Sequence, residues 1–444
     1  MEELLGVSTD LTLAIVYRRI ADLTPHAGNA RTHSKRQIGQ IADSIRFFGF
    51  TNPALVDRTG VIIAGHGRVQ AARLLGMDRV PTIALENLTP DQIRAYILAD
   101  NRLAEKAGWD KETLAVELQH LITLVDLDVS ITGFEVAEID LILQDAADPP
   151  EQAEVLEIGS GLAVTQPGDL WQLGKHRVLC GNSLQESTFS TLLGKRRANV
   201  VFIDPPYNVA IDGNVCGQGS VHHREFAMAS GEMSEVEFIA FLTRSLTLLA
   251  RFSTSGSVHF VCMDWRHMNE LLDAGQRVYD ELLNLCVWVK NNGGMGSFYR
   301  SQHELVFVFR NKAAPHRNNI QLGRYGRNRT NVWTYPGVNT LSRNGEEGNL
   351  LALHPTVKPV ALVADALLDC SARGDFVLDS FLGSGTTLIA AERVGRICYA
   401  VEIDLRYVDV AIRRWQRHTG DHAVHQQTGK RFDELTETQE VSHG

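Results

Sequence analysis

The part of the chain that follows Pro167 alternates short apolar runs with amphipathic segments, and this alternation limits the possible folds most strongly. The run at 200–203 (VVFI) contains no polar residue, as expected for a strand that is buried on both faces. Ser234 and Glu237 have the spacing of a capping box and predict a helix start. The pattern indicates a doubly wound α/β fold with a parallel sheet. Further strands are predicted at 257–262, 285–289, 305–309, 376–378 and 397–401, and further helices at 360–368 and 386–392.

The N-terminal third of the chain has a different texture. Short predicted strands at 54–56 and 61–63 mix with predicted helices at 37–48 and 68–75. From Thr89 to about residue 143 the pattern is helical and amphipathic, and Thr89-Pro90 is a typical helix start. An acidic stretch with two prolines (DAADPPEQAEVLE) then predicts a linker. We therefore expect a small α+β domain, a helical connector with a linker, and an α/β domain, over residues 11–88, 89–150 and 167–418.

Charge is distributed unevenly along the chain, whose formal net charge is −10. Phosphate attraction depends on the local potential rather than on the net charge, so an acidic chain can still bind nucleic acid. From Lys290 to Arg329 basic residues recur against a single acid, Glu304. This basic segment is therefore a candidate for contact with phosphates, and a solvated basic loop is the alternative. The basic residues proposed to contact DNA are Arg324, Arg327 and Arg329.

The six cysteines occur singly, which predicts a reducing compartment and neither a disulfide framework nor a zinc site. No apolar stretch approaches the roughly 20 residues that a helix needs to cross a bilayer. The acidic N-terminus (MEELLGVSTD) lacks the basic region of a signal peptide. We therefore expect a cytoplasmic protein that needs no metal and contacts no membrane.

The motif Asp204-Pro205-Pro206-Tyr207 directly follows the buried run at 200–203. An exocyclic amine on a nucleobase is a poor nucleophile because its lone pair is delocalised into the ring. The Asp204 carboxylate and the Pro205 carbonyl can hold both N–H bonds and free that lone pair, while the paired prolines fix the turn. Tyr207 offers a flat face on which a flipped base can stack. The competing interpretation is a Pro-Pro turn that closes a strand and leaves Asp204 facing solvent.

A second motif, DSFLGSGTT at 379–387, joins a predicted strand to a predicted helix. Gly383 and Gly385 allow a tight turn and the close approach of a ligand to the backbone. The motif lacks the GK[ST] signature, which excludes a nucleoside-triphosphate P-loop. Glu402 ends the next predicted strand, where nucleotide-binding α/β folds place a carboxylate on the ribose hydroxyls.

Together DPPYN, HPTVKP, DSFLGSGTT and VEID resemble the amino-methyltransferase family of DNA N6-adenine and N4-cytosine enzymes, over residues 167–415. Their order resembles the permuted β-type, in which the catalytic motif precedes the cofactor loop. The resemblance implies a Rossmann-like fold, double-stranded DNA as substrate and S-adenosylmethionine as cofactor. It also implies a target-recognition region at about 311–349, between the catalytic strands and HPTVKP. Asn182 stands where the family usually has Asp, so it can accept a hydrogen bond but carries no charge. The cofactor-binding residues that the resemblance implies are Asn182, His354, Lys358, Asp379, Phe381, Gly383, Gly385, Thr386 and Glu402.

Two N-terminal motifs, Asn29-Ala-Arg31 and Gly65-His-Gly-Arg68, resemble the ParB-like N-terminal domain, which binds nucleotides in some relatives. A glycine turn before a helix, followed by an arginine, can present donors to phosphates. The resemblance therefore implies Asn29, Arg31, Gly65 and Arg68 as candidate nucleotide contacts, although Ala30 stands where the family usually has Pro. A structural or DNA-docking module without a nucleotide is an equal alternative, and a homodimer stays open.

The motifs together predict a site-specific DNA methyltransferase of the restriction-modification type that modifies N6 of adenine. Its Asp-led motif resembles the adenine enzymes more than the Ser-led motif of the cytosine enzymes, so N4 of cytosine is the alternative. Two other classes stay open. One is a ParB-like nucleotide-gated DNA-binding protein with a vestigial methyltransferase half, and the other is a methyltransferase that acts on RNA or on protein amides.

Overall fold

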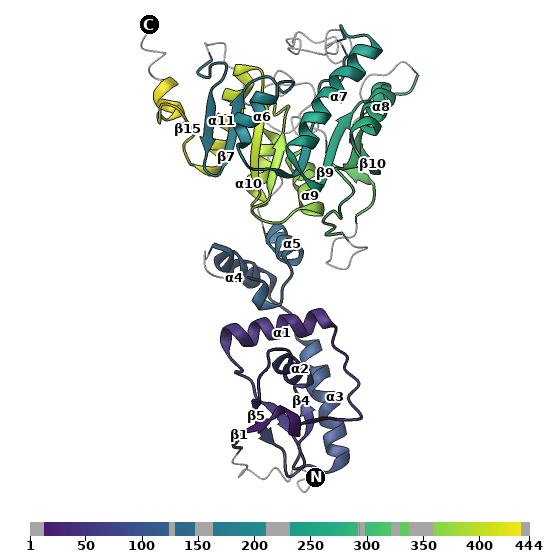
Figure 1. Cartoon of the computed structure of the whole chain (residues 1–444), viewed down its shortest axis with the longest axis vertical. Coiled ribbons are helices and arrows are strands. Elements are labelled where there is room, and N and C mark those ends of the chain that lie inside the picture. The colour runs from purple at the N-terminus through teal and green to yellow at the C-terminus, as the bar shows by residue number, and fades with distance from the viewer. Residues whose placement is uncertain are drawn as a thin grey trace. The chain divides into compact units, whose positions relative to one another are not determined.

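The computed structural model describes residues 13–123, 129–146, 163–209, 231–291, 293, 298–320, 329–336 and 358–436. The chain divides into two compact units, Met1–Ala147 and Asp148–Gly444 (Figure 1). Each unit has its own sheet and its own hydrophobic core. No helix among the described residues is long and apolar enough to span a membrane.

The N-terminal unit is built on a five-stranded mixed sheet in the order β1-β5-β3-β4-β2. Helix α1 (Lys35–Phe48) begins at Ser34, whose hydroxyl accepts a hydrogen bond from the Gln37 N–H. Helix α2 (His66–Leu74) packs its buried face on the sheet, where Val69 and Ala72 join the core. The strands are β1 (Ile15–Arg19), β2 (Thr24–Pro25), β3 (Ala54–Val56), β4 (Val61–Ala64) and β5 (Arg79–Ala84).

Three α-helices and one 3-10 helix follow this small domain among the described residues of the same unit. Helix α3 (Pro90–Lys106) starts with a complete capping box between Thr89 and Gln92, so the predicted helix start is confirmed. Glu135 accepts hydrogen bonds from Arg36 and Gln40 of α1, which ties the connector to the small domain. The later helices are α4 (Lys111–Thr123), η2 (Val129–Thr132) and α5 (Val136–Ala146).

The C-terminal unit contains a ten-stranded sheet in the order β12-β10-β11-β9-β8-β13-β14-β7-β6-β15. Its five central strands, from β9 to β7, are parallel. The prediction of a parallel sheet is wrong at the flanks, where β9, β11 and β10 pair antiparallel, as do β7, β6 and β15. The consecutive strands β6 and β7, and likewise β10 and β11, pair with each other, and neighbours of this kind pair antiparallel because a parallel pair needs a long crossover connection. The strands are β6 (Leu170–Leu173), β7 (His176–Cys180), β8 (Ala198–Ile203), β9 (Ser253–Met263), β10 (Glu281–Val289), β11 (His303–Arg310), β12 (Val332–Thr334), β13 (Phe376–Asp379), β14 (Ile397–Glu402) and β15 (Val424–His425).

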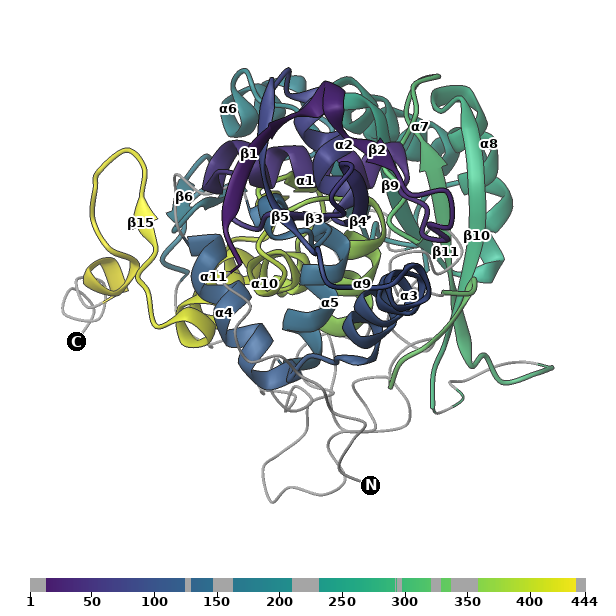
Figure 2. The same ribbon diagram turned by 90° about the horizontal axis from the view of Figure 1, so that it is seen from below.

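Helices cover both faces of this sheet, as expected for a doubly wound fold. On β8, Val200 and Phe202 point into one core and Val201 and Ile203 into the other, which confirms a strand buried on both faces. One core includes residues of α9, α10 and α11, and the other includes residues of α6, α7 and α8. Figure 2 shows α8 beside β10. The helices are α6 (Glu186–Leu193), α7 (Glu235–Arg251), α8 (Met268–Val278), α9 (Val360–Cys370), α10 (Thr386–Arg393) and α11 (Leu405–Thr419).

Candidate active site

The predicted motifs meet because they follow the carboxyl ends of neighbouring parallel strands. Asp204 follows β8, Asp379 ends β13, Glu402 ends β14 and Asn182 lies just beyond β7. These strands are adjacent and parallel, so their carboxyl ends lie along one edge of the sheet. This edge is where ligands bind in open α/β sheets.

The Asp204 carboxylate is held by two neighbours. One oxygen, Oδ1, accepts a hydrogen bond from the Tyr207 hydroxyl, and the other, Oδ2, lies 2.6 Å from Nζ of Lys358. Pro205 is buried, and the turn ends at Asn208, whose side chain bonds to the backbone of Met233. Because the Asp204 side chain is only 23 % exposed and ion-paired, the interpretation as a solvent-facing turn residue is wrong.

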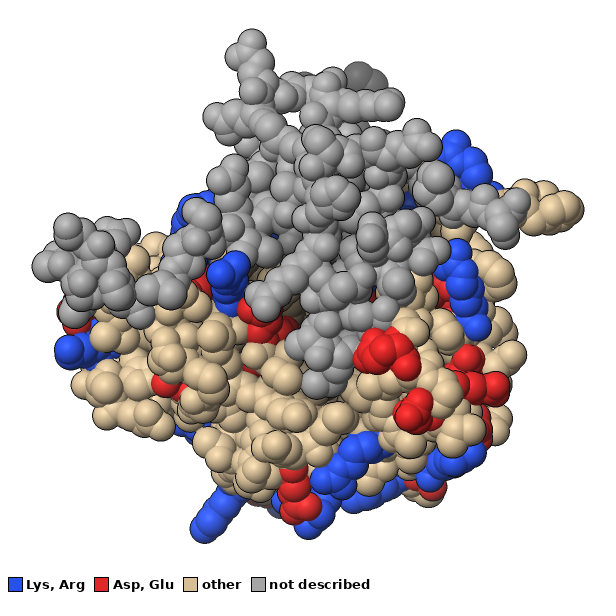
Figure 3. Space-filling view, turned by 90° about the horizontal axis from the view of Figure 1, so that it is seen from above, with Lys and Arg blue, Asp and Glu red and all other residues tan. Residues whose placement is uncertain are grey.

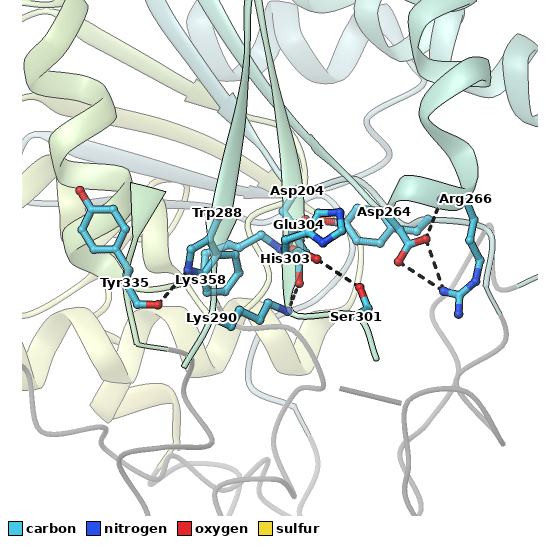
Figure 4. A network of polar contacts seen from close by, with 11 residues as sticks. Asp204, Asp264, Arg266, Trp288, Lys290, Ser301, His303, Glu304, Tyr335 and Lys358 are labelled. Carbon is cyan, nitrogen blue, oxygen red and sulfur yellow. Dashed lines mark hydrogen bonds and ion pairs between the residues drawn. The ribbon is translucent and has the colours of Figure 1, made fainter. Parts of the chain in front are cut away.

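Lys358 lies immediately before α9, and its side chain is 3 % exposed. Its ammonium group contacts Asp204 and lies 2.8 Å from Oε2 of Glu304 (Figure 4). It also lies 3.2 Å from the Tyr207 hydroxyl. These contacts match the three N–H bonds that a lysine can donate. The resemblance placed Lys358 near the cofactor. That placement stays a prediction. In the structure the ammonium group pairs with the carboxylate of the catalytic motif, because the residue precedes a helix that packs against β8.

Glu304, on β11, is a member of this cluster that the sequence did not reveal. Its side chain is 7 % exposed and receives hydrogen bonds from Lys290 on one oxygen and Lys358 on the other. Trp288 lies directly opposite Glu304 in the β10–β11 register, and both ammonium groups lie within 6 Å of its ring centroid. The sequence does contain a signal for Glu304, because this acid lies inside an apolar predicted strand (HELVFVFR). The charge pattern identified it only as the single acid of a basic segment.

The four charges stabilise one another. Burial favours the neutral form of Glu304, but Lys358 and Lys290 outweigh it and lower the pKa of this carboxyl to about 2. Burial opposes the charge on Lys358, yet Asp204 and Glu304 raise the pKa of the ammonium group above its usual range. Burial also raises the pKa of Asp204, an effect that Lys358 opposes and Glu304 reinforces. The cluster of Asp204, Lys358, Glu304 and Lys290, which we call the charge chain, therefore alternates in sign and sums to zero when all four are ionised.

The glycine loop and Glu402 form the neighbouring part of the edge. Gly383 (φ 54°) and Gly385 (φ 91°) have left-handed backbones, a conformation that glycine adopts without strain. The Gly383 N–H donates to Oε2 of Glu402 at 2.8 Å, while Oε1 accepts from the N–H groups of residues 403 and 404. Burial raises the pKa of Glu402. The structure thus brings together the loop and the acid that the sequence placed in one site.

The remaining predicted cofactor residues lie around this loop. Asp379 accepts a hydrogen bond from the Phe381 N–H at 2.9 Å, and burial raises the pKa of Asp379 to about 7. The Thr386 hydroxyl accepts from Arg414 at 3.3 Å. The side-chain oxygen of Asn182 accepts a hydrogen bond from the Leu184 N–H. The preceding residue, Gly181, donates its N–H to the Glu402 carbonyl. His354 lies outside the described residues.

The recognition segment is described only in part. Arg324 and Arg327 lie outside the described residues. The Arg329 guanidinium is 16 % exposed and forms ion pairs with Asp365 at 2.8 Å and Asp369 at 3.0 Å, both on α9. Two carboxylates of α9 hold this charge in the structure, and the contact of Arg324, Arg327 and Arg329 with DNA stays a prediction. On the face shown in Figure 3, basic side chains lie mainly towards the margins, with acidic ones among them.

The two ParB-like motifs lie side by side in the N-terminal unit. The His26 N–H donates to Nε2 of His66, which links the loop that carries Asn29 to the start of α2. Gly65 has a left-handed backbone (φ 91°) and caps α2. Arg68 donates to the Pro53 carbonyl at 3.4 Å, and Asn29 accepts from the Arg31 N–H.

Arg31 also has a partner in the described structure. Its guanidinium lies 3.2 Å from Oε1 of Glu105, on α3. The structure therefore brings the two motifs together but commits the Arg31 and Arg68 side chains to contacts within the protein. That Asn29, Arg31, Gly65 and Arg68 bind a nucleotide stays a prediction.

Three known families match successive parts of the chain. Residues 198–413 match the DNA methylase family of N6/N4 methyltransferases, and residues 13–101 match the ParB N-terminal domain. Residues 112–167 match the ParB-methyltransferase HTH domain, which sequence reasoning had interpreted only as connector and linker. Residues 198–413 therefore form an N6/N4 DNA methylase domain, and a ParB-like N-terminal domain precedes it in the chain.

Individual proteins are similar to different parts of the chain. A ParB-like nuclease domain-containing protein, YnaK of Escherichia coli (strain K12), is 58 % identical over 80 residues, which cover 18 % of this chain and 92 % of the relative. The type II methyltransferase M2.MboI of Moraxella bovis is 25 % identical over 235 residues, covering 50 % of this chain and 81 % of the relative. A DNA modification methylase of Thermus thermophilus, solved with S-adenosyl-L-methionine, aligns with a TM-score of 0.39 and 20 % identity over 56 % of this chain and 96 % of that one.

Proposed function

We propose that this protein methylates N6 of adenine at a specific site in double-stranded DNA, with S-adenosylmethionine as the methyl donor. The observation that carries the proposal is the Asp204 carboxylate, held at the sheet edge beside the loop that contains Gly383 and Gly385. The proposal places the protein in the cytoplasm, with the DNA.

The loop fits S-adenosylmethionine in its shape and in its donors. No described atom lies within 4 Å of a Cβ built on Gly383, which leaves space beside the backbone. We assign Glu402 to the ribose hydroxyls, and Asp379, Phe381 and Asn182 to the pocket around the donor. When bound, the donor supplies an electrophilic methyl group on a sulfonium.

The residues of the catalytic motif prepare the amine for attack. Asp204 and the Pro205 carbonyl accept hydrogen bonds from the two N–H bonds of a flipped adenine, which directs the nitrogen lone pair at the methyl group. As the N–C bond forms and the C–S bond breaks, the nitrogen gains a positive charge that Asp204 stabilises. The nitrogen then loses one proton, for which the ionised Asp204 is the nearest acceptor. Tyr207 provides a face for the base.

Adenine is favoured over cytosine because the motif is led by Asp rather than Ser. The intact charge chain and glycine loop disfavour the class in which the methyltransferase half is vestigial. Transfer of labelled methyl groups to duplex DNA, to RNA and to protein tests the proposal. We expect label in duplex DNA alone, and label only in RNA or protein would contradict it.

Replacing Gly385 with alanine is expected to weaken the binding of S-adenosylmethionine about tenfold. The substitution strains a left-handed backbone (φ 91°) and places a Cβ 3.0 Å from that of Ala411. Gly420, at the C-terminus of α11, also has a left-handed backbone (φ 77°) but has open space around its Cβ position. The Gly420→Ala variant is therefore the matched control, and calorimetry should find its affinity unchanged. Equal losses in both variants would contradict a role for the loop in binding.

Replacing Arg324 and Arg327 together with glutamine is expected to weaken DNA binding and to flatten its dependence on salt. Arg329→Gln is expected to lower the thermal stability instead, because it leaves Asp365 and Asp369 without their shared cation. Binding isotherms at several salt concentrations give the slope for each variant. A flatter slope for Arg329→Gln would contradict the structural role of this arginine.

A further inference from the structure

We propose that Glu304 and Lys290 are positioning residues that control how firmly Lys358 holds the Asp204 carboxylate in its ionised, oriented form. The inference rests on the proposed function, in which Asp204 is catalytic. It concerns two residues of the β10–β11 hairpin that lie outside the motifs of the family resemblance.

The first step of the inference is that two carboxylates share Lys358. Its Nζ lies 2.6 Å from Asp204 and 2.8 Å from Glu304, and the side chain is buried. A buried ammonium group that bridges two carboxylates strengthens one contact when the other is weakened. Glu304 therefore competes with Asp204 for the same charge.

The second step is that Lys290 limits this competition. Its ammonium group binds the other oxygen of Glu304, so Glu304 is partly neutralised from the hairpin side. Lys290 is the more exposed of the two lysines, at 27 % against 3 % for Lys358. The chain of charges thus runs from the catalytic carboxylate to a residue near the surface.

The third step is that the hairpin fixes this geometry. The Lys290 N–H donates to the Gln302 carbonyl at 2.9 Å, which continues the β10–β11 ladder. Trp288 lies opposite Glu304, and its indole N–H donates to the Tyr335 carbonyl at 3.0 Å. The Trp288 ring held in this way lies within 6 Å of both ammonium groups. Lys290 contacts one oxygen of the Glu304 carboxylate and Lys358 contacts the other (Figure 4).

The sign of each effect follows from the order of charges. Glu304→Gln removes the competitor and gives Lys358 wholly to Asp204, so the pKa of Asp204 falls and catalysis persists to lower pH. Lys290→Met removes the cation that restrains Glu304, so the pKa of Asp204 rises and catalysis is lost at higher pH. Each shift is about one pH unit, as expected for a unit charge a few ångströms away in a partly shielded site.

Other titratable groups face Asp204, and both variants leave them in place. Tyr207, which follows β8, and Cys262, on β9, have pKa values raised by burial and are neutral near pH 7. Burial raises the pKa of Asp379, on β13, to about 7, so this group can add a limb of its own to the profile. A limb of the pH profile that arises from Asp379 is present in every variant. Shifts of opposite sign in Glu304→Gln and Lys290→Met are expected only from the charge chain.

The experiment measures kcat against pH for the full-length enzyme with saturating S-adenosylmethionine and duplex DNA. We expect the acid limb to move down in Glu304→Gln, up in Lys290→Met, and to return towards the wild-type position in the double variant. Lys290→Arg keeps the charge and should leave the limb in place. Equal directions of shift, or lower rates without a shift, would show only structural support and would overturn the proposal.

A second readout separates this proposal from the proposed function. Carbon-13 NMR of the Asp204 carboxyl reports its titration in the DNA-free enzyme and needs no turnover. If the wild type methylates no DNA but the NMR shifts have opposite signs in the two variants, the proposed function fails and the coupling stands. If the wild type methylates DNA and the NMR titration is unmoved, the coupling fails alone. Lys290→Met, which alters the more exposed lysine, keeps the test available where Glu304→Gln fails to fold.

Discussion

The Asp204→Ala variant is expected to lose about 10³-fold in kcat while its affinity for S-adenosylmethionine stays close to that of the wild type. The proposed function places the Asp204 carboxylate, which pairs with Lys358, against the base. It assigns the donor contacts to the glycine loop and Glu402, which are joined by the Gly383 N–H. Lys358 retains Glu304 as its partner in this variant, so the fold should persist.

Single-turnover rates and calorimetry on the same preparation give the two quantities. Asp204→Asn is the matched control, since it keeps the shape and one acceptor but removes the charge, and its rate should lie between the other two. Loss of donor binding together with the folded state in Asp204→Ala would mean that Asp204 is structural.

The Lys358→Met variant is expected to lose about 3–5 kcal/mol of folding free energy along with its activity. The substitution leaves Asp204 and Glu304 buried beside each other without the ammonium group between them. Lys195→Met, which removes a lysine from an exposed position, is the control and should change stability by less than about 0.5 kcal/mol.

The loss in Lys358→Met should depend on pH with a definite sign. The pKa of Glu304 is about 2 in the folded protein, below its usual value. The ion pairs of Glu304 therefore stabilise the folded state at neutral pH, and this contribution decreases as the pH falls. The difference in stability between wild type and Lys358→Met should therefore be largest above about pH 5 and shrink below about pH 4. Denaturant unfolding across this range gives the difference, and a loss that grows in acid would contradict the ion-pair explanation.

Much of the fold could be predicted because its signals are local. The capping boxes at Thr89 and Ser234 begin helices where the sequence placed them, since a cap involves residues only three positions apart. The buried strand β8 was evident from its apolar run. The antiparallel flanks of the sheet were missed, because a strand pattern does not state the direction in which it pairs.

The candidate site could be predicted only in part, for the same physical reason. Asp204 follows one apolar strand and Glu402 ends another. The carboxyl ends of adjacent parallel strands lie at one edge of the sheet, so the position of both acids at that edge follows from the sequence. The position of Glu304 in the site depends on the register between β10 and β11. The position of Lys358 depends on the packing of α9 against β8. Arg329 finds its carboxylate partners on a later helix. Such contacts arise between distant segments and leave no local pattern.

The most direct test of the central claim is mass spectrometry of nucleosides from duplex DNA that was treated with the enzyme and methyl-labelled S-adenosylmethionine. We predict labelled N6-methyladenine with the wild type and none with Asp204→Ala. Labelled N4-methylcytosine would keep the mechanism but contradict the choice of base. No labelled nucleoside, from an enzyme that is folded and binds the donor, would contradict the assignment of this site to DNA methylation.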